Sequence, residues 1–160
     1  MNALLHRGAL ALLGAGGTAT GVWAYMAPRH WYDNFPGLGM SWLPQLGPYN
    51  EHFAKDVGAM FLAMAAVTAV TFVLVANQIL VRVTAVMWLV FNTLHCIYHL
   101  SMLQMYNTRD ATLNAILLPL LVLAAAALFS PVRINQPRLD ASAASSLDDG
   151  RRNPVAREAD

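Results

Sequence analysis

The sequence predicts an all-α fold: an integral membrane four-helix bundle with an aromatic extracytoplasmic loop between helices 1 and 2. Composition is the first reason, because 57% of the 160 residues are hydrophobic and only 12% are charged, unlike an average soluble domain. The second is that four long stretches contain no Lys, Arg, Asp or Glu: residues 8–28, 57–81, 83–108 and 111–132. Each stretch is long enough to cross a bilayer as a helix.

We therefore expect four spans in one membrane domain over residues 1–132, at about 6–27, 52–76, 81–106 and 111–130. Residues 133–160 show no apolar periodicity and are predicted to be a disordered cytoplasmic tail. The net charge of +1 indicates no nucleic-acid partner, and membrane lipids are the expected surroundings.

The distribution of Lys and Arg predicts the orientation. Seven of these residues fall at the termini and in the loop around Arg82, against three in the other two loops. Without the far tail the ratio is four to three. The positive-inside rule then predicts that both termini lie in the cytoplasm, N-in/C-in. We expect a multi-pass protein of the inner (plasma) membrane.

The first span is rich in small residues, and Gly17 to Gly21 form a GxxxG motif that allows a neighbouring helix to approach closely. The motif suits packing inside the bundle and dimerisation equally well. We expect this span to be retained and not cleaved as a signal peptide, because the bulky Trp23 suits an interfacial aromatic belt better than a peptidase site.

The loop at 29–50 alternates aromatic residues with proline and glycine, which predicts no regular helix there. It is interpreted as a loop resting on the membrane or as a lid over a site between the helices.

The second span is predicted to begin after Asn50, a good N-cap, with Glu51 in the first turn. At 100° per residue one stripe of this helix carries small and polar residues: His52, Asp56, Ala59, Ala63, Ala66 and Val70. Small residues mark helix contacts in membranes, so Asp56 is expected to face the bundle.

The third span carries polar residues on one face, Asn92, His95 and His99, together with Trp88. Polar groups in lipid are costly and mark a function or a specific partner. The start of the second span and the end of the third lie at the same level, so Asp56 is expected to meet His99 and, less easily, His95. In the fourth span Pro119 is expected to bend the helix.

Two segments resemble small actinobacterial proteins related to the DoxX-like membrane proteins. These segments are Gly47–Ala59, with its Asn-Glu-His-x-x-x-Asp-x-Gly start, and Trp88–Leu100, with its paired histidines. The resemblance covers about residues 5–130 and implies a four-helix bundle. Some DoxX relatives associate with oxidoreductases, which implies an accessory role in a larger membrane protein complex.

The polar residues allow three functions. The first is a metal or redox site, because His95 and His99 at i, i+4 project from one helical face, and His52 and Asp56 have the same spacing. Two or three imidazoles and one carboxylate suit zinc, iron or copper.

The second function is a pocket for a lipid, isoprenoid or quinone, with Asn92, Tyr98 and Trp88 as binding residues and His99 donating to a carbonyl. The third, which we favour at this point, is an accessory or scaffold subunit whose Asp–His cluster holds the bundle together. No nucleophile–base set, phosphate loop or cofactor motif appears, so no enzyme is predicted.

Overall fold

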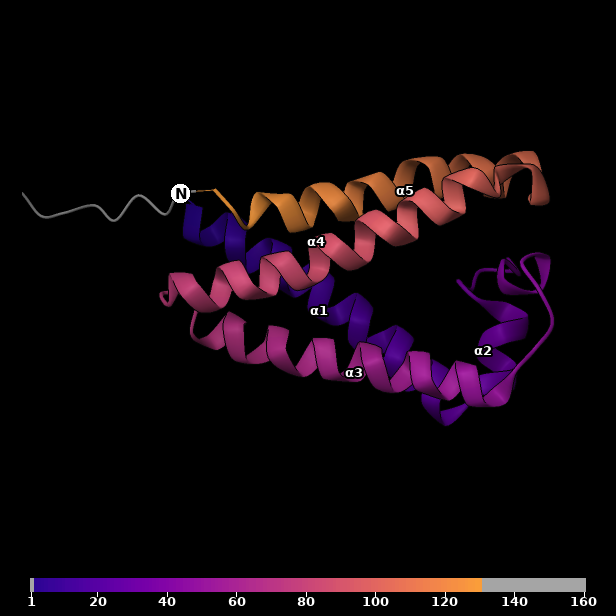
Figure 1. Ribbon diagram of the computed structural model, residues 1–160, viewed down its shortest axis with the longest axis horizontal. Helices are drawn as coiled ribbons and strands as arrows, with labels where there is room; N and C mark the ends of the chain where they lie inside the picture. Colours follow the sequence, from indigo (N-terminus) through magenta and orange to yellow (C-terminus); the bar gives the residue numbers. More distant parts are fainter. Residues whose placement is uncertain (1, 131–160) are drawn as a thin grey trace, which may run out of the picture.

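The computed structural model describes residues 2–130, and the predicted tail at 133–160 lies outside them. Within these residues the fold is all-helical and has no strand, so the predicted all-α class is confirmed. Figure 1 shows four long helices that run side by side: α1 (Asn2–Met26), α3 (Glu51–Val73), α4 (Gln78–Ser101) and α5 (Thr108–Ala127).

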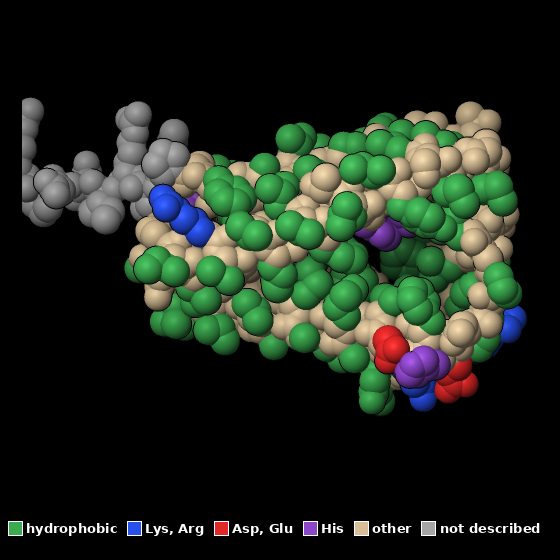
Figure 2. All heavy atoms as spheres, viewed as in Figure 1, with side chains coloured by type: hydrophobic (Ala, Val, Ile, Leu, Met, Phe, Trp, Pro, Cys, Tyr) green, Lys and Arg blue, Asp and Glu red, His purple; other side chains and the backbone are tan. Residues whose placement is uncertain are grey.

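Three of these helices, α3, α4 and α5, are long and apolar enough to cross a membrane. In α1 the glycines and threonines between Gly14 and Gly21 dilute the apolar run, and α1 is not among the three. Large apolar side chains face outwards along the other helices, and Val70, Val90 and Leu120 are each more than half exposed. This apolar exterior, green in Figure 2, is what a lipid-facing surface requires.

An asparagine begins each of the three apolar helices. The side-chain oxygens of Asn50, Asn77 and Asn107 accept hydrogen bonds from backbone N–H groups in the first turns of α3, α4 and α5. Each bond satisfies one of the donors that a helix start leaves free. The predicted start of α3 after Asn50 is therefore confirmed.

The third predicted span ends earlier than expected, because α4 stops at Ser101 and not near 106. The Ser101 hydroxyl donates to the carbonyl of Tyr98, and such local bonds compete with helix continuation. A short 3₁₀ turn, Leu103–Met105, then leads to α5.

The segment between α1 and α3 begins with a short helix, α2 (Pro28–Asn34). The expectation that residues 29–50 contain no regular helix is therefore wrong for this part. Proline is well tolerated in the first turn, where its missing N–H has no partner to lose. After α2 the chain is irregular apart from a 3₁₀ turn at Leu43–Gln45.

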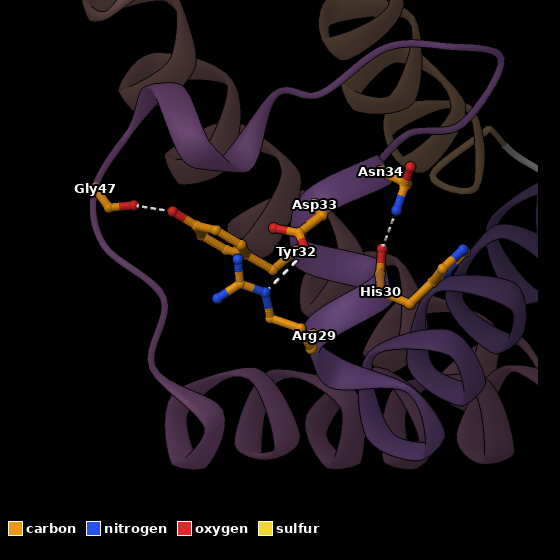
Figure 3. Close-up of polar contacts among 6 residues, drawn as sticks. All are labelled: Arg29, His30, Tyr32, Asp33, Asn34 and Gly47. Atoms are coloured by element: carbon orange, nitrogen blue, oxygen red, sulfur yellow. Dashed lines mark hydrogen bonds and ion pairs between the residues drawn. The ribbon is translucent and has the colours of Figure 1, made fainter.

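Polar contacts fasten this segment into a cap over one end of the bundle. In Figure 3 the Tyr32 hydroxyl donates to the carbonyl of Gly47, which holds the returning chain against α2. Arg29 donates to Asp33 at 2.8 Å, and its guanidinium lies 5.1 Å from the centre of the Tyr49 ring. We call residues 27–50 the cap.

The closest helix contact joins α1 to α3 through glycines. A Cβ placed on Gly58 would lie 2.6 Å from the backbone nitrogen of Tyr25 and 3.0 Å from the carbonyl oxygen of Gly21. One placed on Gly17 would lie 2.9 Å from the Trp88 ring. The GxxxG motif of α1 therefore packs inside the bundle.

The predicted inner stripe of α3 is wrong. His52, Asp56, Ala59, Ala63, Ala66 and Val70 are all exposed, and α3 buries a different set: Ala54, Gly58, Met64, Ala65, Thr68 and Thr71. Both faces of this helix offer small residues, and the close contact of Gly58 with α1 selects the second face. Asp56, two residues before Gly58, lies about 200° around the helix from it.

The bundle is tight at one end and open at the other. Near the α3–α4 turn the hydroxyls of Thr71 and Thr84 are hydrogen-bonded at 2.7 Å, and a buried cluster that includes Leu10, Val81 and Leu128 fills the centre. Toward the cap, α4 and α5 diverge from α1 and α3 (Figure 1).

Candidate functional site

The surface is hollowed between α3 and α4, in the half of the bundle nearer the cap (Figure 2). Apolar side chains surround this hollow, and a histidine lies at the edge formed by α4. The histidines of α4 are His95 and His99. We call this hollow the α3–α4 cleft. It is a candidate ligand site because it opens between two helices that expose large apolar side chains.

His95 and His99 contact each other directly. Their ring centres are 4.3 Å apart and their planes are tilted by 59°. Two imidazoles that share one tetrahedral zinc ion hold their ring centres about 5 Å apart, given Zn–N bonds of about 2.0–2.1 Å. The two rings thus pack against each other, somewhat closer than that separation.

The two imidazoles belong to a continuous row of aromatic rings. Phe61 on α3 contacts Phe91 on α4 edge-on at 5.1 Å, and Phe91 stacks on His95 at 5.3 Å. On the other side Tyr106 lies parallel to His99 at 6.4 Å. These rings continue into the cap through Trp42, so the aromatic row consists of Phe61, Phe91, His95, His99, Tyr106 and Trp42.

Tyr106 fixes the orientation of His99. Its hydroxyl is hydrogen-bonded to Nδ1 of His99 at 3.2 Å. Burial raises the pKa of Tyr106 to about 12, with smaller contributions from Tyr98 and Asp110. The phenol is therefore neutral at physiological pH and able to donate its proton to His99.

Buried amides flank the pair. Asn92 is 3% exposed and Asn114 is fully buried. Asn114 donates to the carbonyl of Asp110 at 3.0 Å and lies beside His99. Nδ2 of Asn92 and Oδ1 of Asn114 have no hydrogen-bond partner within the described residues. A buried polar group without a partner costs about 1–3 kcal/mol, so it marks a place where a ligand or water gains a hydrogen bond.

Of the other two predicted binding residues, one is buried in the bundle and one faces outwards. Trp88 is buried, and its indole N–H donates to the Thr68 hydroxyl at 2.8 Å, which ties α4 to α3 below the cleft. Tyr98 is 48% exposed and faces outwards, although the edge of its ring meets His99 at 5.6 Å.

Asp56 and His52 do not join the site, and the expectation that Asp56 meets His99 or His95 is wrong. These two side chains are 63% and 88% exposed and pair with each other at 3.2 Å. Lys55 and Glu51 form a similar exposed pair at 3.2 Å. The cause is the Gly58 contact, which turns this side of α3 outwards.

The four predicted metal ligands are therefore not brought together. Within residues 4–130 no three His, Cys, Asp or Glu side chains are close enough to hold one metal ion. His95 and His99 alone supply one imidazole each, and Nδ1 of His99 is hydrogen-bonded to Tyr106.

Sequence reasoning missed Phe91 and the role of Asn114, and it included Trp42 only as part of an aromatic loop that could cover the site. The position of Phe91 could have been predicted from the sequence. Phe91, His95 and His99 are each four residues apart and therefore lie on the same face of the helix. Nothing local indicated Trp42, because its contact with Tyr106 joins segments more than 60 residues apart.

No protein-family model, curated protein or solved structure matches the chain. The fold and the site together define a helical protein with membrane-compatible helices and a histidine-bearing cleft between two of them.

Proposed function

We propose that this protein is a four-span plasma-membrane protein that binds an amphipathic ligand from the lipid phase, of the lipid, isoprenoid or quinone type, in the α3–α4 cleft. The observation that carries the proposal is the His95–His99 pair, set in an aromatic row beside an opening between two apolar helices. Ligand pockets are typically apolar with a few convergent polar groups.

The proposal includes α1 as the fourth span. This helix has 25 residues, enough to cross a bilayer, and it packs against α3 through Gly17, Gly21 and Gly58. A helix in such close contact with a membrane-spanning neighbour lies in the same membrane as that neighbour. The orientation with both termini in the cytoplasm places the cap and the cleft in the outer half of the membrane.

A purely structural role for the polar residues is less well supported. That role depends on a bond between Asp56 and His99, but Asp56 is exposed on the outer side of α3 and His99 is buried. His95 makes no hydrogen bond within the described part of the chain, so it adds no polar tie between helices. The DoxX-like relationship and membership of a larger complex remain predictions.

The first test is a search for the ligand. Protein purified in mild detergent is extracted with organic solvent, and the extract is compared by mass spectrometry with that of a Phe91→Ala variant. We expect one lipid-phase molecule that co-purifies with the native protein and is depleted at least tenfold in the variant. Equal lipid profiles for both proteins would refute the proposal.

Two control variants are built into this test. Leu94→Ala removes a side chain of the same helix that is 64% exposed, and it is expected to retain the ligand. Asp56→Asn removes the carboxylate once expected at the site and is also expected to retain it. Loss of the ligand in either control would mean that binding depends on the outer surface of the bundle.

A further inference from the structure

The chemistry around the cleft restricts the headgroup of its ligand, and this inference rests on the proposed function. We infer that the cleft selects an uncharged headgroup that accepts hydrogen bonds, of the carbonyl class, and rejects anionic phosphate headgroups. The aromatic row then packs against the ring or the chain that carries the carbonyl.

Within the described residues, a phosphate headgroup would find no Lys or Arg side chain in the aromatic row. Near the cap, Arg29 is paired with Asp33 at 2.8 Å, and Lys55 is paired with Glu51 on the outer face of α3. Arg109 is exposed. A phosphate in a membrane site is normally met by Arg or Lys, and within the described residues none of these three lies in the aromatic row.

The carboxylate nearest the row is that of Asp110. It is buried, contributes to the raised pKa of Tyr106 and accepts from the side chain of Asn107 at 3.0 Å, whereas Asp56 is on the outer surface. An anionic headgroup would therefore meet a carboxylate and none of the three cationic side chains named above. Leaving a charge unpaired in low dielectric is costly, so the site favours an uncharged group.

Hydrogen-bond donors are in excess around the cleft. Nδ2 of Asn92 and Nε1 of Trp42 are buried donors without a partner within residues 4–130. If the Tyr106 hydroxyl donates to Nδ1 of His99, the proton of His99 lies on Nε2, and the amide of Asn114 beside this ring can accept from it. Oδ1 of Asn114 is the one acceptor of this set. A ligand that enters this group supplies acceptors, as a carbonyl oxygen does.

The experiment uses the full chain in nanodiscs and three probes with the same decyl tail: a decyl-benzoquinone, decylbenzene and decyl phosphate. Quinones quench tryptophan fluorescence, and Trp42 and Trp88 contact the aromatic row. The quinone is titrated directly, and the other two are used as competitors. We expect saturable quenching by the quinone, at least tenfold weaker competition by decylbenzene and no competition by decyl phosphate.

A matched pair of variants tests the donor argument. Tyr106→Phe keeps the ring but removes the hydroxyl that sets the tautomer of His99, and it is expected to weaken quinone binding at least fivefold while leaving decylbenzene unchanged. Tyr98→Phe removes a hydroxyl from the neighbouring exposed tyrosine and is expected to have no effect.

The outcomes separate the two proposals. If decylbenzene or decyl phosphate competes as well as the quinone does, the cleft binds lipid-phase molecules but the inferred headgroup selectivity is wrong. If no probe binds and no lipid co-purifies, the proposed function itself fails. An equal loss in Tyr98→Phe and Tyr106→Phe would also contradict the donor argument.

Discussion

Gly58 on α3 faces Gly21 on α1 so closely that neither position has room for a side chain. A Cβ on Gly21 would lie 2.9 Å from a side-chain carbon of Leu62 and 3.0 Å from the carbonyl oxygen of Gly58. This contact fixes the rotation of α3, and with it the outward position of Asp56. The placement of the candidate site therefore depends on two glycines that lie outside it.

The first prediction is that Gly58→Ala destabilises the protein. The added methyl would overlap the backbone of Tyr25, which cannot move without displacing α1, and overpacking of this kind costs about 1–3 kcal/mol. Unfolding in mixed micelles with increasing SDS measures the change. Gly16→Ala is the control, because nothing lies within 4 Å of a Cβ there.

In this control alanine is expected to be neutral or to add stability of about 0.5–1 kcal/mol, since glycine is unfavourable within a helix. Equal stability of the two variants would contradict the close contact between α1 and α3.

The second prediction concerns the bond between Trp88 and Thr68 below the cleft. Polar bonds between membrane helices contribute about 0.6 kcal/mol on average. A double-mutant cycle with Thr68→Val and Trp88→Phe is expected to give a coupling free energy of about 0.5–1.5 kcal/mol. Thr18→Val, which removes an exposed hydroxyl bonded within its own helix, combined with Trp88→Phe should give no coupling.

Local features of the fold were predictable and long-range ones were not. Asn50 as a cap can be read from the sequence because the cap and its partner, the N–H of Phe53, are three residues apart. The buried face of α3 could not be predicted from the sequence, because the helix has two stripes of small residues. The contact of Gly58 with Gly21 determines which stripe is buried. The histidine pair was predictable from its i, i+4 spacing, but the contact of Trp42 with Tyr106 was not.

The third prediction concerns the pH dependence of stability above pH 10. The pKa of Tyr106 is raised from the ordinary value of 10 to about 12 in the folded protein. Between these values the unfolded chain loses the phenolic proton while the folded protein keeps it, so stability falls as the pH rises. Absorbance at 295 nm should show one tyrosine that ionises near pH 12.

Tyr106→Phe is expected to remove both this late ionisation and the associated loss of stability. Tyr98→Phe should keep a late ionisation at a slightly lower pH, because burial is the largest cause of the raised pKa and Tyr98 contributes less. A late ionisation that persists in Tyr106→Phe would mean that another tyrosine is responsible.

The fourth prediction tests the orientation in the membrane. Cys96 is the single cysteine and is buried, so a Cys96→Ala background allows new cysteines to be placed at exposed turns. Because the Lys and Arg distribution places both termini in the cytoplasm, Gln45→Cys and Gln104→Cys should react with a membrane-impermeant maleimide in intact cells. Ala76→Cys, in the turn between α3 and α4, should react only after lysis. The reverse pattern would place the cleft in the cytoplasmic half of the membrane, where its ligand would enter from the inner leaflet.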